Sequence, residues 1–247
     1  MNIFIDIETL RAPEETRLQM LEDANENFKA PNTLTKAQAA IDLGLTDAKE
    51  IKFTSKDDMI AKWEKELVTT KALEVASAAW EKTSFNPDVA PIACICIDID
   101  NQKISFDLNN FKSEGLMLKE FHECISNFCF NHNAETTKPN FIGHYITKFD
   151  LPFIWKRSII NNVAPYKYKW IDAKHGYNCY DTMTAWAGYG NSISADKLCK
   201  LLGIKGKTEG MDGSLVYDTW QADPYKVINY CHDDVTLVKE IHARLTK

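Results

Sequence analysis

Two acidic residues near the start of the chain have the spacing of a metal-binding pair. The alternating, β-branched residues of the segment 2–7 (NIFIDI) predict a strand. Asp6 lies within this segment, and Glu8 follows it directly. Side chains two residues apart on a strand point to the same side, so the two carboxylates share one face. Carboxylates that close repel each other unless a cation neutralises them, and hard divalent ions such as Mg²⁺ prefer oxygen ligands. The alternative is a solvated strand end whose acids face water.

A third acidic residue, Asp150, follows a later predicted strand. The segment 143–153 (GHYITKFDLPF) leaves a short strand predicted at 140–144 and enters a helix predicted at about 149–161. Asp150 therefore lies at the N-terminal end of that helix. A carboxylate there is favoured by the helix dipole, and Pro152 suits a first turn. Simple capping is the alternative to a chemical role.

The last acidic position belongs to a helix predicted at 223–245, which begins at an Asp-Pro pair typical of a helix start. Tyr230 and Asp234 are four residues apart, so they share one face of this helix. His232 is rotated from Tyr230 by about 200° and points away from any site that Asp234 faces. The alternative is a tyrosine packed in the core and a solvated aspartate.

The three motifs taken together resemble the DEDD exonuclease superfamily, which has the ribonuclease H-like fold of polymerase proofreading domains. D-x-E on the first strand, F-D after a middle strand and Y-x-x-x-D on the last helix occur in that family's order. The position of Tyr230, four residues before Asp234, resembles the last motif of the tyrosine branch of this superfamily. The histidine branch has His where this chain has Asn229. The segments 143–154, 180–183 and 198–234 are similar to family B polymerase-like stand-alone exonucleases. The resemblance covers residues 1–10 and roughly 91–247.

The resemblance implies a set of roles for the matching residues. Its metal ligands are Asp6, Glu8, Asp150 and Asp234, which hold two Mg²⁺ or Mn²⁺ ions roughly 4 Å apart. Tyr230 orients the attacking water, since a phenol with a pKa near 10 is a poor general base. The expected reaction releases nucleoside 5′-monophosphates from the 3′ end of DNA, with single strands preferred.

Four further residues are expected to touch the terminal nucleotide: Thr9, Leu10, His144 and Phe149. Core packing is the alternative for Leu10, His144 and Phe149. One departure from the relatives concerns the position after His144, where they usually have Asn and this chain has Tyr145. We expect that difference to alter how the strand end is held.

The elements that must position these residues predict an α/β fold. Apolar residues at 91–99 and an alternating segment at 103–108 predict a hairpin, and 114–131 and 194–203 predict helices. The expected architecture is a ribonuclease H-like mixed sheet flanked by helices. Residues 11–90 are charged and helical in pattern. We interpret 1–247 as a single exonuclease domain with a helical insertion at about 11–90; a small separate helical subdomain is the alternative.

Charge is distributed unevenly along this acidic chain, whose net charge is −6. The span 156–207 contains three acids and nine basic residues: Lys156, Arg157, Lys167, Lys169, Lys174, Lys197, Lys200, Lys205 and Lys207. Aromatic residues are interleaved with them: Tyr166, Tyr168, Trp170, Tyr177, Tyr180, Trp186 and Tyr189. Rings of this kind stack on bases and cations follow phosphates, so we expect some of them to contact nucleic acid. A basic surface over an aromatic core is the alternative.

The segment 11–90 has 11 basic and 15 acidic residues, which argues against a strong DNA clamp. A lid over the strand end and a docking surface for a protein partner are both open roles. The seven cysteines contain no C-x-x-C pair, so we expect reduced thiols and no zinc site of the usual spacing. No apolar run is long enough to span a bilayer, and we expect a cytoplasmic protein without membrane contact.

Three other functions remain open at this level. An RNA 3′ exonuclease uses the same carboxylates, because the choice of sugar depends on contacts to the 2′-hydroxyl. A catalytically silent fold that binds nucleic acid or a partner is a second reading. A ribonuclease H-like endonuclease is a third, which the Tyr230 and Asp234 pairing disfavours.

Overall fold

The structure, a computed structural model, describes residues 1–131, 139–165, 170–206 and 210–247. Contacts between residues divide the chain into two compact units. The core unit consists of Met1–Leu10 and Phe85–Lys247, and the helical unit consists of Arg11–Ser84. Each unit has its own buried side chains.

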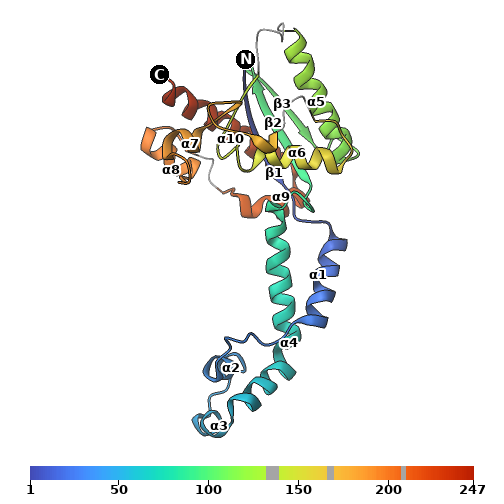
Figure 1. The fold of residues 1–247 in the computed structure, drawn as a ribbon, viewed down its shortest axis with the longest axis vertical. Helices are drawn as coiled ribbons and strands as arrows, with labels where there is room; N and C mark the ends of the chain where they lie inside the picture. Colours follow the sequence, from blue (N-terminus) through green and yellow to red (C-terminus); the bar gives the residue numbers. More distant parts are fainter. Residues whose placement is uncertain (132–138, 166–169, 207–209) are drawn as a thin grey trace. The chain divides into compact units, whose positions relative to one another are not determined.

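A five-stranded sheet organises the core unit, in the order β3-β2-β1-β4-β5. Strands β1, β2 and β3 are labelled in Figure 1. Its strands are β1 (Asn2–Thr9), β2 (Ile92–Ile99), β3 (Gln102–Asp107), β4 (Asn140–Gly143) and β5 (Cys179–Asp181). β1 pairs antiparallel with β2 and parallel with β4, and β4 pairs parallel with β5. The carboxyl ends of the three parallel strands therefore meet at one edge of the sheet, which is where open α/β sheets tend to place ligands.

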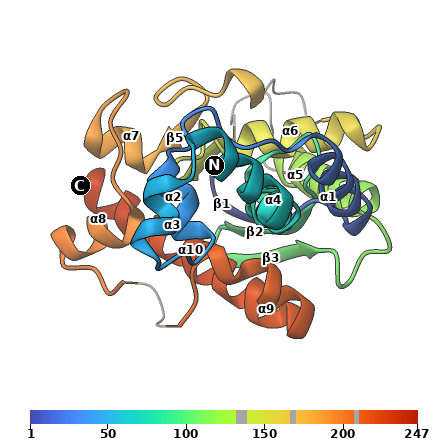
Figure 2. The same ribbon diagram turned by 90° about the horizontal axis from the view of Figure 1, so that it is seen from below.

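Alternation along β1 assigns its side chains to two different layers. Ile3, Ile5 and Ile7 are buried with residues of α5 (Glu114–Asn131) and α6 (Asp150–Ile160). Phe4 and the residues of even number face α9 (Val216–Ala222) and α10 (Pro224–Leu245). Figure 2 shows α5 and α6 on one side of the strands and α9 and α10 on the other. Asp6 and Glu8 thus belong to the α10 side.

The long helix α10 is fixed to this second face of the sheet by packing and by ion pairing. Asp223 caps it and Pro224 occupies its first turn, as the sequence predicted. Val227, Cys231 and Val235 are buried against the sheet. Near the far end of the helix, Lys239 Nζ lies 2.7 Å from an oxygen of the buried Asp98 on β2. Together these contacts set the position of every side chain on α10.

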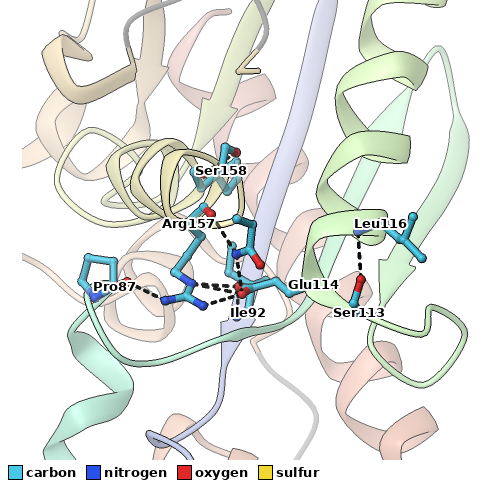
Figure 3. A network of polar contacts seen from close by, with 9 residues as sticks. Pro87, Ile92, Ser113, Glu114, Leu116, Arg157 and Ser158 are labelled. Atoms are coloured by element: carbon cyan, nitrogen blue, oxygen red, sulfur yellow. Dashed lines mark hydrogen bonds and ion pairs between the residues drawn. The ribbon is translucent and has the colours of Figure 1, made fainter. Parts of the chain in front are cut away.

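A buried ion pair fixes α6 on the opposite face (Figure 3). Arg157 Nε lies 3.0 and 3.1 Å from the two carboxylate oxygens of Glu114, the first residue of α5. Glu114 also accepts the N–H of Ile92 at 2.8 Å, and Arg157 donates to the carbonyl of Pro87. Removing one partner of such a buried pair typically costs about 3–5 kcal/mol. The network therefore holds the helix that begins at Asp150.

Shorter elements complete the core unit along its second half. They are η2 (Trp170–Asp172), α7 (Thr182–Ala187), α8 (Ala195–Leu202) and η3 (Gly213–Leu215). Leu198 and Cys199 of α8 are buried against Leu237 and Ile241 of α10. Gly203 ends α8 in the left-handed conformation, with φ of 65°, which confirms the predicted end of that helix.

The helical unit contains α1 (Glu14–Asn27), α2 (Lys36–Asp42), α3 (Ala48–Phe53), α4 (Lys56–Glu81) and most of η1 (Lys82–Phe85). Ser55 caps α4 by accepting the N–H of Asp58. Met59 and Trp63 of α4 are buried with Leu34 and with alanines of α2. Trp63 Nε1 donates to Asp42 at 2.9 Å. The unit therefore has a small core of its own.

A mixed sheet flanked by helices is the α/β class expected from the sequence, and it is compatible with a ribonuclease H-like exonuclease fold. The predicted hairpin and the helices at 114–131, 149–161 and 223–245 are present within one residue of their expected bounds. Within the described ranges, no helix combines the length and the apolar character needed to cross a bilayer.

Candidate active site

Three carboxylates from two distant parts of the chain meet on the α10 face of the sheet. Asp6 and Glu8 extend from β1, and Asp234 extends from α10. One carboxylate oxygen of each lies within 4.8 Å of one oxygen of each of the others. Asp6 and Glu8 are half-buried and Asp234 is buried. An oxygen-only set at this spacing, with an exposed side, suits a hard divalent cation.

Asp150 joins this group from the first turn of α6. Its carboxylate is buried, and Oδ1 accepts the N–H of Ile7 at 3.2 Å. Ile7 lies between Asp6 and Glu8, so the bond brings Asp150 to the strand segment that carries the other two. Burial, together with the negative charges of Asp181 and Asp234, raises the pKa of Asp150 to about 7. A carboxylate held in this way ionises far more readily when a cation is beside it.

Buried thiols line the inner side of the carboxylate group. Cys94 and Cys96 are directly opposite Glu8 and Asp6 in the antiparallel pairing of β1 with β2. Their sulfur atoms and that of Cys231 lie within 4.8 Å of one another. Burial raises the pKa of Cys231 well above its usual range, so this neutral thiol donates to Asp6 Oδ2 at 3.4 Å. Sequence spacing gave no sign of this convergence, because the third cysteine comes from a helix 135 residues after Cys96.

Tyr230 and the residues expected to touch substrate occupy varied surroundings. Tyr230 is buried one turn before Asp234 on α10. Thr9 and Leu10 are both buried, and Leu10 packs with residues of α9. Phe149 packs between Phe85 and Phe153, with ring centroids 6.2 and 5.3 Å away.

His144 engages two neighbours through its ring. Nδ1 lies 3.0 Å from the hydroxyl of Thr182, and Nε2 lies 2.9 Å from the carbonyl oxygen of Ile193. These contacts connect the end of β4 to α7 and to the segment before α8. His144 therefore holds these neighbouring segments in place. Its expected contact with substrate remains a prediction.

A buried aspartate that the sequence did not assign a role shapes the turn leading to Asp150. Asp181 ends β5, is fully buried and accepts five hydrogen bonds of 2.7–3.2 Å. The donors are the N–H groups of Tyr145, Thr147, Met183 and Thr184 and the hydroxyl of Thr147. One carboxylate therefore caps α7 and also secures the loop after β4. The signal in the sequence was an aspartate directly before a helix start.

The same loop contains a backbone conformation that few side chains adopt. Tyr145 has a φ of 65°, and its side chain is 45% exposed. Asn is several-fold enriched in this region, and a bulky residue there is strained. The usual Asn of the relatives is therefore the residue that this backbone favours. The preceding Gly143 is required by packing, since an added Cβ would lie 2.8 Å from the Cβ of Ile146.

A family of nuclease domains matches the segment that contains most of these elements. Residues 83–239, well over half of the chain, match the model of a predicted 3′–5′ exonuclease related to the exonuclease domain of PolB. The chain belongs to this exonuclease family. No curated protein matches the chain.

Membership in the exonuclease family implies a nucleic acid substrate, and exonuclease domains of this kind generally use divalent metal ions. The matched residues of the exonuclease include Asp150, Tyr230 and Asp234, but they begin after Asp6 and Glu8. The structure brings those two carboxylates, from outside the match, against Asp234 inside it.

Part of the basic and aromatic segment lies outside the described residues: Tyr166, Lys167, Tyr168, Lys169 and Lys207. Among the described aromatic residues, Trp170 is buried in the core, in agreement with the alternative of core packing. Tyr177, Trp186 and Tyr189 are 86%, 46% and 75% exposed. These three rings are therefore available for contact with another molecule.

Proposed function

We propose that the chain is a metal-dependent 3′–5′ exonuclease of the tyrosine branch of the DEDD superfamily, acting on DNA with single strands preferred. The observation that carries this proposal is the meeting of Asp6 and Glu8 with Asp234. The family match alone supports exonuclease activity. The convergence of carboxylates on one edge adds a place where that activity can occur.

Asp6, Glu8, Asp150 and Asp234 hold two divalent cations in this proposal, Mg²⁺ or Mn²⁺. The donor set fits such ions because it contains only carboxylate oxygens and because burial of Asp150 disfavours an uncompensated charge. When bound, the cations supply the Lewis acidity that activates water and stabilises the leaving 3′ oxygen.

The side chains of the protein position the reactants. Tyr230 shares a face of α10 with Asp234, so its hydroxyl orients the attacking water beside the carboxylates. The N–H of Ile7 and the ion pair at Arg157 fix the place of Asp150. Preorganised groups of this kind lower the barrier because they need not reorient during the reaction.

Thr9 and Leu10 receive the terminal nucleotide, because they follow Glu8 directly along β1. His144 and Phe149, before and after the loop that Asp181 secures, contribute the other side of the same subsite. Residues 11–84 act as an insertion carried by the exonuclease core, and a docking surface for a protein partner is one role open to it.

The decisive experiment follows a 5′-labelled single-stranded DNA and a matching RNA in Mg²⁺, with and without chelator. We expect progressive shortening from the 3′ end of the DNA, release of nucleoside 5′-monophosphates, and loss of all activity in chelator. Faster shortening of the RNA would favour an exoribonuclease. Cleavage of a circular single strand would indicate an endonuclease.

Neighbouring residues of α10 provide a matched pair of variants. Asp234→Asn should reduce the rate by about 10³-fold or more, since it removes a proposed ligand. Asp233→Asn, at the exposed adjacent position, should leave the rate within about twofold. Equal rates for the two variants would contradict the proposal.

Tyr230→Phe tests the assignment to the tyrosine branch. It keeps the ring that is buried in α10 and removes the hydroxyl, so we expect a rate about 10–100-fold lower with an unchanged melting temperature. An unchanged rate would remove Tyr230 from the mechanism while leaving the metal site intact.

A further inference from the structure

A cavity of about 540 Å³ opens beside the loop that leads to Asp150. Its wall is formed by four separate segments: 145–148, 173–175, 183–184 and 189–192. Lys148, which lines it, is two residues before Asp150, so the two Cα atoms are at most about 7 Å apart. One lining residue of the cavity is therefore close along the chain to a proposed metal ligand, and the roles given above leave the cavity unused.

The cavity is basic although the chain as a whole is acidic. Lys148, Lys174 and His175 line it, and none of its described lining residues is an Asp or Glu. Asp181, two residues before Met183, is fully buried and accepts five hydrogen bonds from the protein. Asp172, next to Ala173, is exposed but does not line the cavity. A phosphate group entering the cavity would therefore meet two lysines and no carboxylate among the described lining residues.

Aromatic rings are exposed at the same cavity. Tyr145 and Tyr189 line it, and they are 45% and 75% exposed. The hydroxyl of Tyr189 donates to the carbonyl of His175 at 3.1 Å, which ties this ring to the facing segment. Large exposed rings held in place by one hydrogen bond present a flat apolar surface at low entropic cost.

Backbone strain adds an argument that the cavity is a binding site. Tyr145 keeps a φ of 65°, which is unfavourable for a tyrosine, because Asp181 holds its N–H. Strained residues persist where the surrounding structure over-determines them, and they gather at binding sites. The strained backbone conformation of Tyr145 is the one in which its exposed ring lines the cavity.

We propose that this cavity binds an internal nucleotide of the single strand whose 3′ end lies in the active site. The base stacks on Tyr189, and the neighbouring phosphates lie against Lys174 and Lys148. Stacked rings combined with flanking cations are the general means of holding single strands without reading their sequence. This inference rests on the proposed function and specifies where the rest of the substrate runs.

The test compares a long and a minimal substrate on the full-length, Mg²⁺-loaded protein. A twelve-residue oligothymidylate reaches the cavity, whereas the p-nitrophenyl ester of thymidine 5′-monophosphate occupies only the active site. Tyr189→Ala should raise KM for the oligonucleotide about 10-fold, because base stacking on a protein ring has that magnitude. The same variant should leave kcat on the oligonucleotide, and both constants for the small ester, within about twofold.

Matched variants separate a stacking role from a change in folding. Tyr189→Phe keeps the ring and should stay within about threefold of the unsubstituted protein. Tyr225→Ala removes a tyrosine on α10 that is 59% exposed and lies outside the cavity, and it should have no effect. An unchanged KM for the oligonucleotide in Tyr189→Ala, or an equal loss on both substrates, would overturn the proposal.

Binding measured without turnover distinguishes this inference from the proposed function. Fluorescence anisotropy of a labelled oligothymidylate in Ca²⁺ should show a Kd about 10-fold weaker for Tyr189→Ala. If the protein hydrolyses neither substrate but shows this difference in binding, the proposed function fails and the cavity assignment stands. If it hydrolyses both substrates and the two Kd values are equal, the cavity assignment fails and the proposed function stands.

Discussion

The core unit and the helical unit are stabilised in different ways, and the difference locates the chemistry. In the core unit, isoleucines of central strands pack with helices that are far away in the sequence. In the helical unit, Trp63 and Met59 pack with residues at most 35 positions away, within α2 and before it. No carboxylate or thiol cluster found among the described residues lies in the helical unit. The carboxylate and thiol clusters thus occur in the unit whose packing joins residues that are far apart in the sequence.

Substitution of one aspartate in each unit should give the largest difference in exonuclease rate between the units. Asp150→Asn should reduce the exonuclease rate by about 10³-fold or more, because it removes a proposed ligand. The Asn can still accept the N–H of Ile7. Asp42→Asn weakens the bonds from Trp63 and Gln38, which both lie within the helical unit, and we expect the rate to stay within about twofold. Rates are measured on 5′-labelled DNA.

The same substitution should stabilise the core unit when no divalent cation is present. The folded pKa of Asp150, about 7, lies above the unfolded value of 3.8, so ionisation costs stability as the pH rises between them. At pH 8 we expect Asp150→Asn to raise the free energy of unfolding by about 1–3 kcal/mol in chelator. A loss of stability in denaturant titrations would show that the carboxylate is structural.

Trp63→Ala should destabilise the helical unit by about 3–5 kcal/mol, because it removes the largest side chain of that small core. Hydrogen exchange should accelerate in peptides from 34–67 and stay unchanged in peptides from β1 and β2. The surface substitution Val75→Ala, on the same helix at a position 53% exposed, is the control. Faster exchange throughout the chain would mean that the two units unfold as one.

Mild acid should distinguish the units because every histidine of the chain belongs to the core unit. Burial lowers the pKa of His122 from 6.5 to about 4. The unfolded chain then binds more protons between these values, so stability falls as the pH drops below about 6.5. For His122 alone the loss is about 2 kcal/mol at pH 5.

Hydrogen exchange, corrected for the intrinsic effect of pH, checks this expectation. Peptides of α5 and α6 should lose protection between pH 7 and pH 5, while those of α4 keep theirs. His122→Gln retains a partner for the hydroxyl of Ser158 and should flatten the dependence. An unaltered slope in that variant would assign the effect to other groups.

Removal of the helical unit should have the smallest effect. Leu10 donates to the carbonyl of Pro91 at 2.9 Å in the core unit, and Ala12 donates to the hydroxyl of Thr83 at 2.8 Å in the helical unit. The two connecting segments therefore run side by side. Replacing 11–84 by a four-residue Gly-Ser linker should leave hydrolysis of the small ester within about threefold. Failure of the shortened chain to fold would break the comparison.

Much of the fold could be predicted from the sequence because its elements have clear local signals. The alternation of β1, the cap at Ser55 and the Asp-Pro start of α10 each depend on a few adjacent residues. The place of β1 between β2 and β4 follows from pairing with segments that are about 80 residues away or more, for which a single sequence carries no direct signal. The resemblance to known exonucleases predicted a mixed sheet flanked by helices, and the order of its strands was not predicted.

The candidate site was predicted only in part. Residue types and spacing selected Asp6, Glu8, Asp150 and Asp234, and the structure draws them together, while their roles stay predictions. The five bonds to Asp181 and the thiol of Cys231 beside Asp6 depend on three-dimensional packing. The cavity at Tyr189 likewise arises from four segments whose proximity no spacing reveals.

The register of β1 determines the position of the carboxylates and of the core isoleucines together. Ile5 and Ile7 face one layer while Asp6 and Glu8 face the other. A one-residue insertion early in this strand would turn the isoleucines toward the carboxylate side and drive the acids into the apolar layer. An insertion of this kind in β1 would therefore remove the carboxylate site and disrupt the apolar core together. A variant of β1 that is inactive but still well folded can arise only by substitution of a carboxylate.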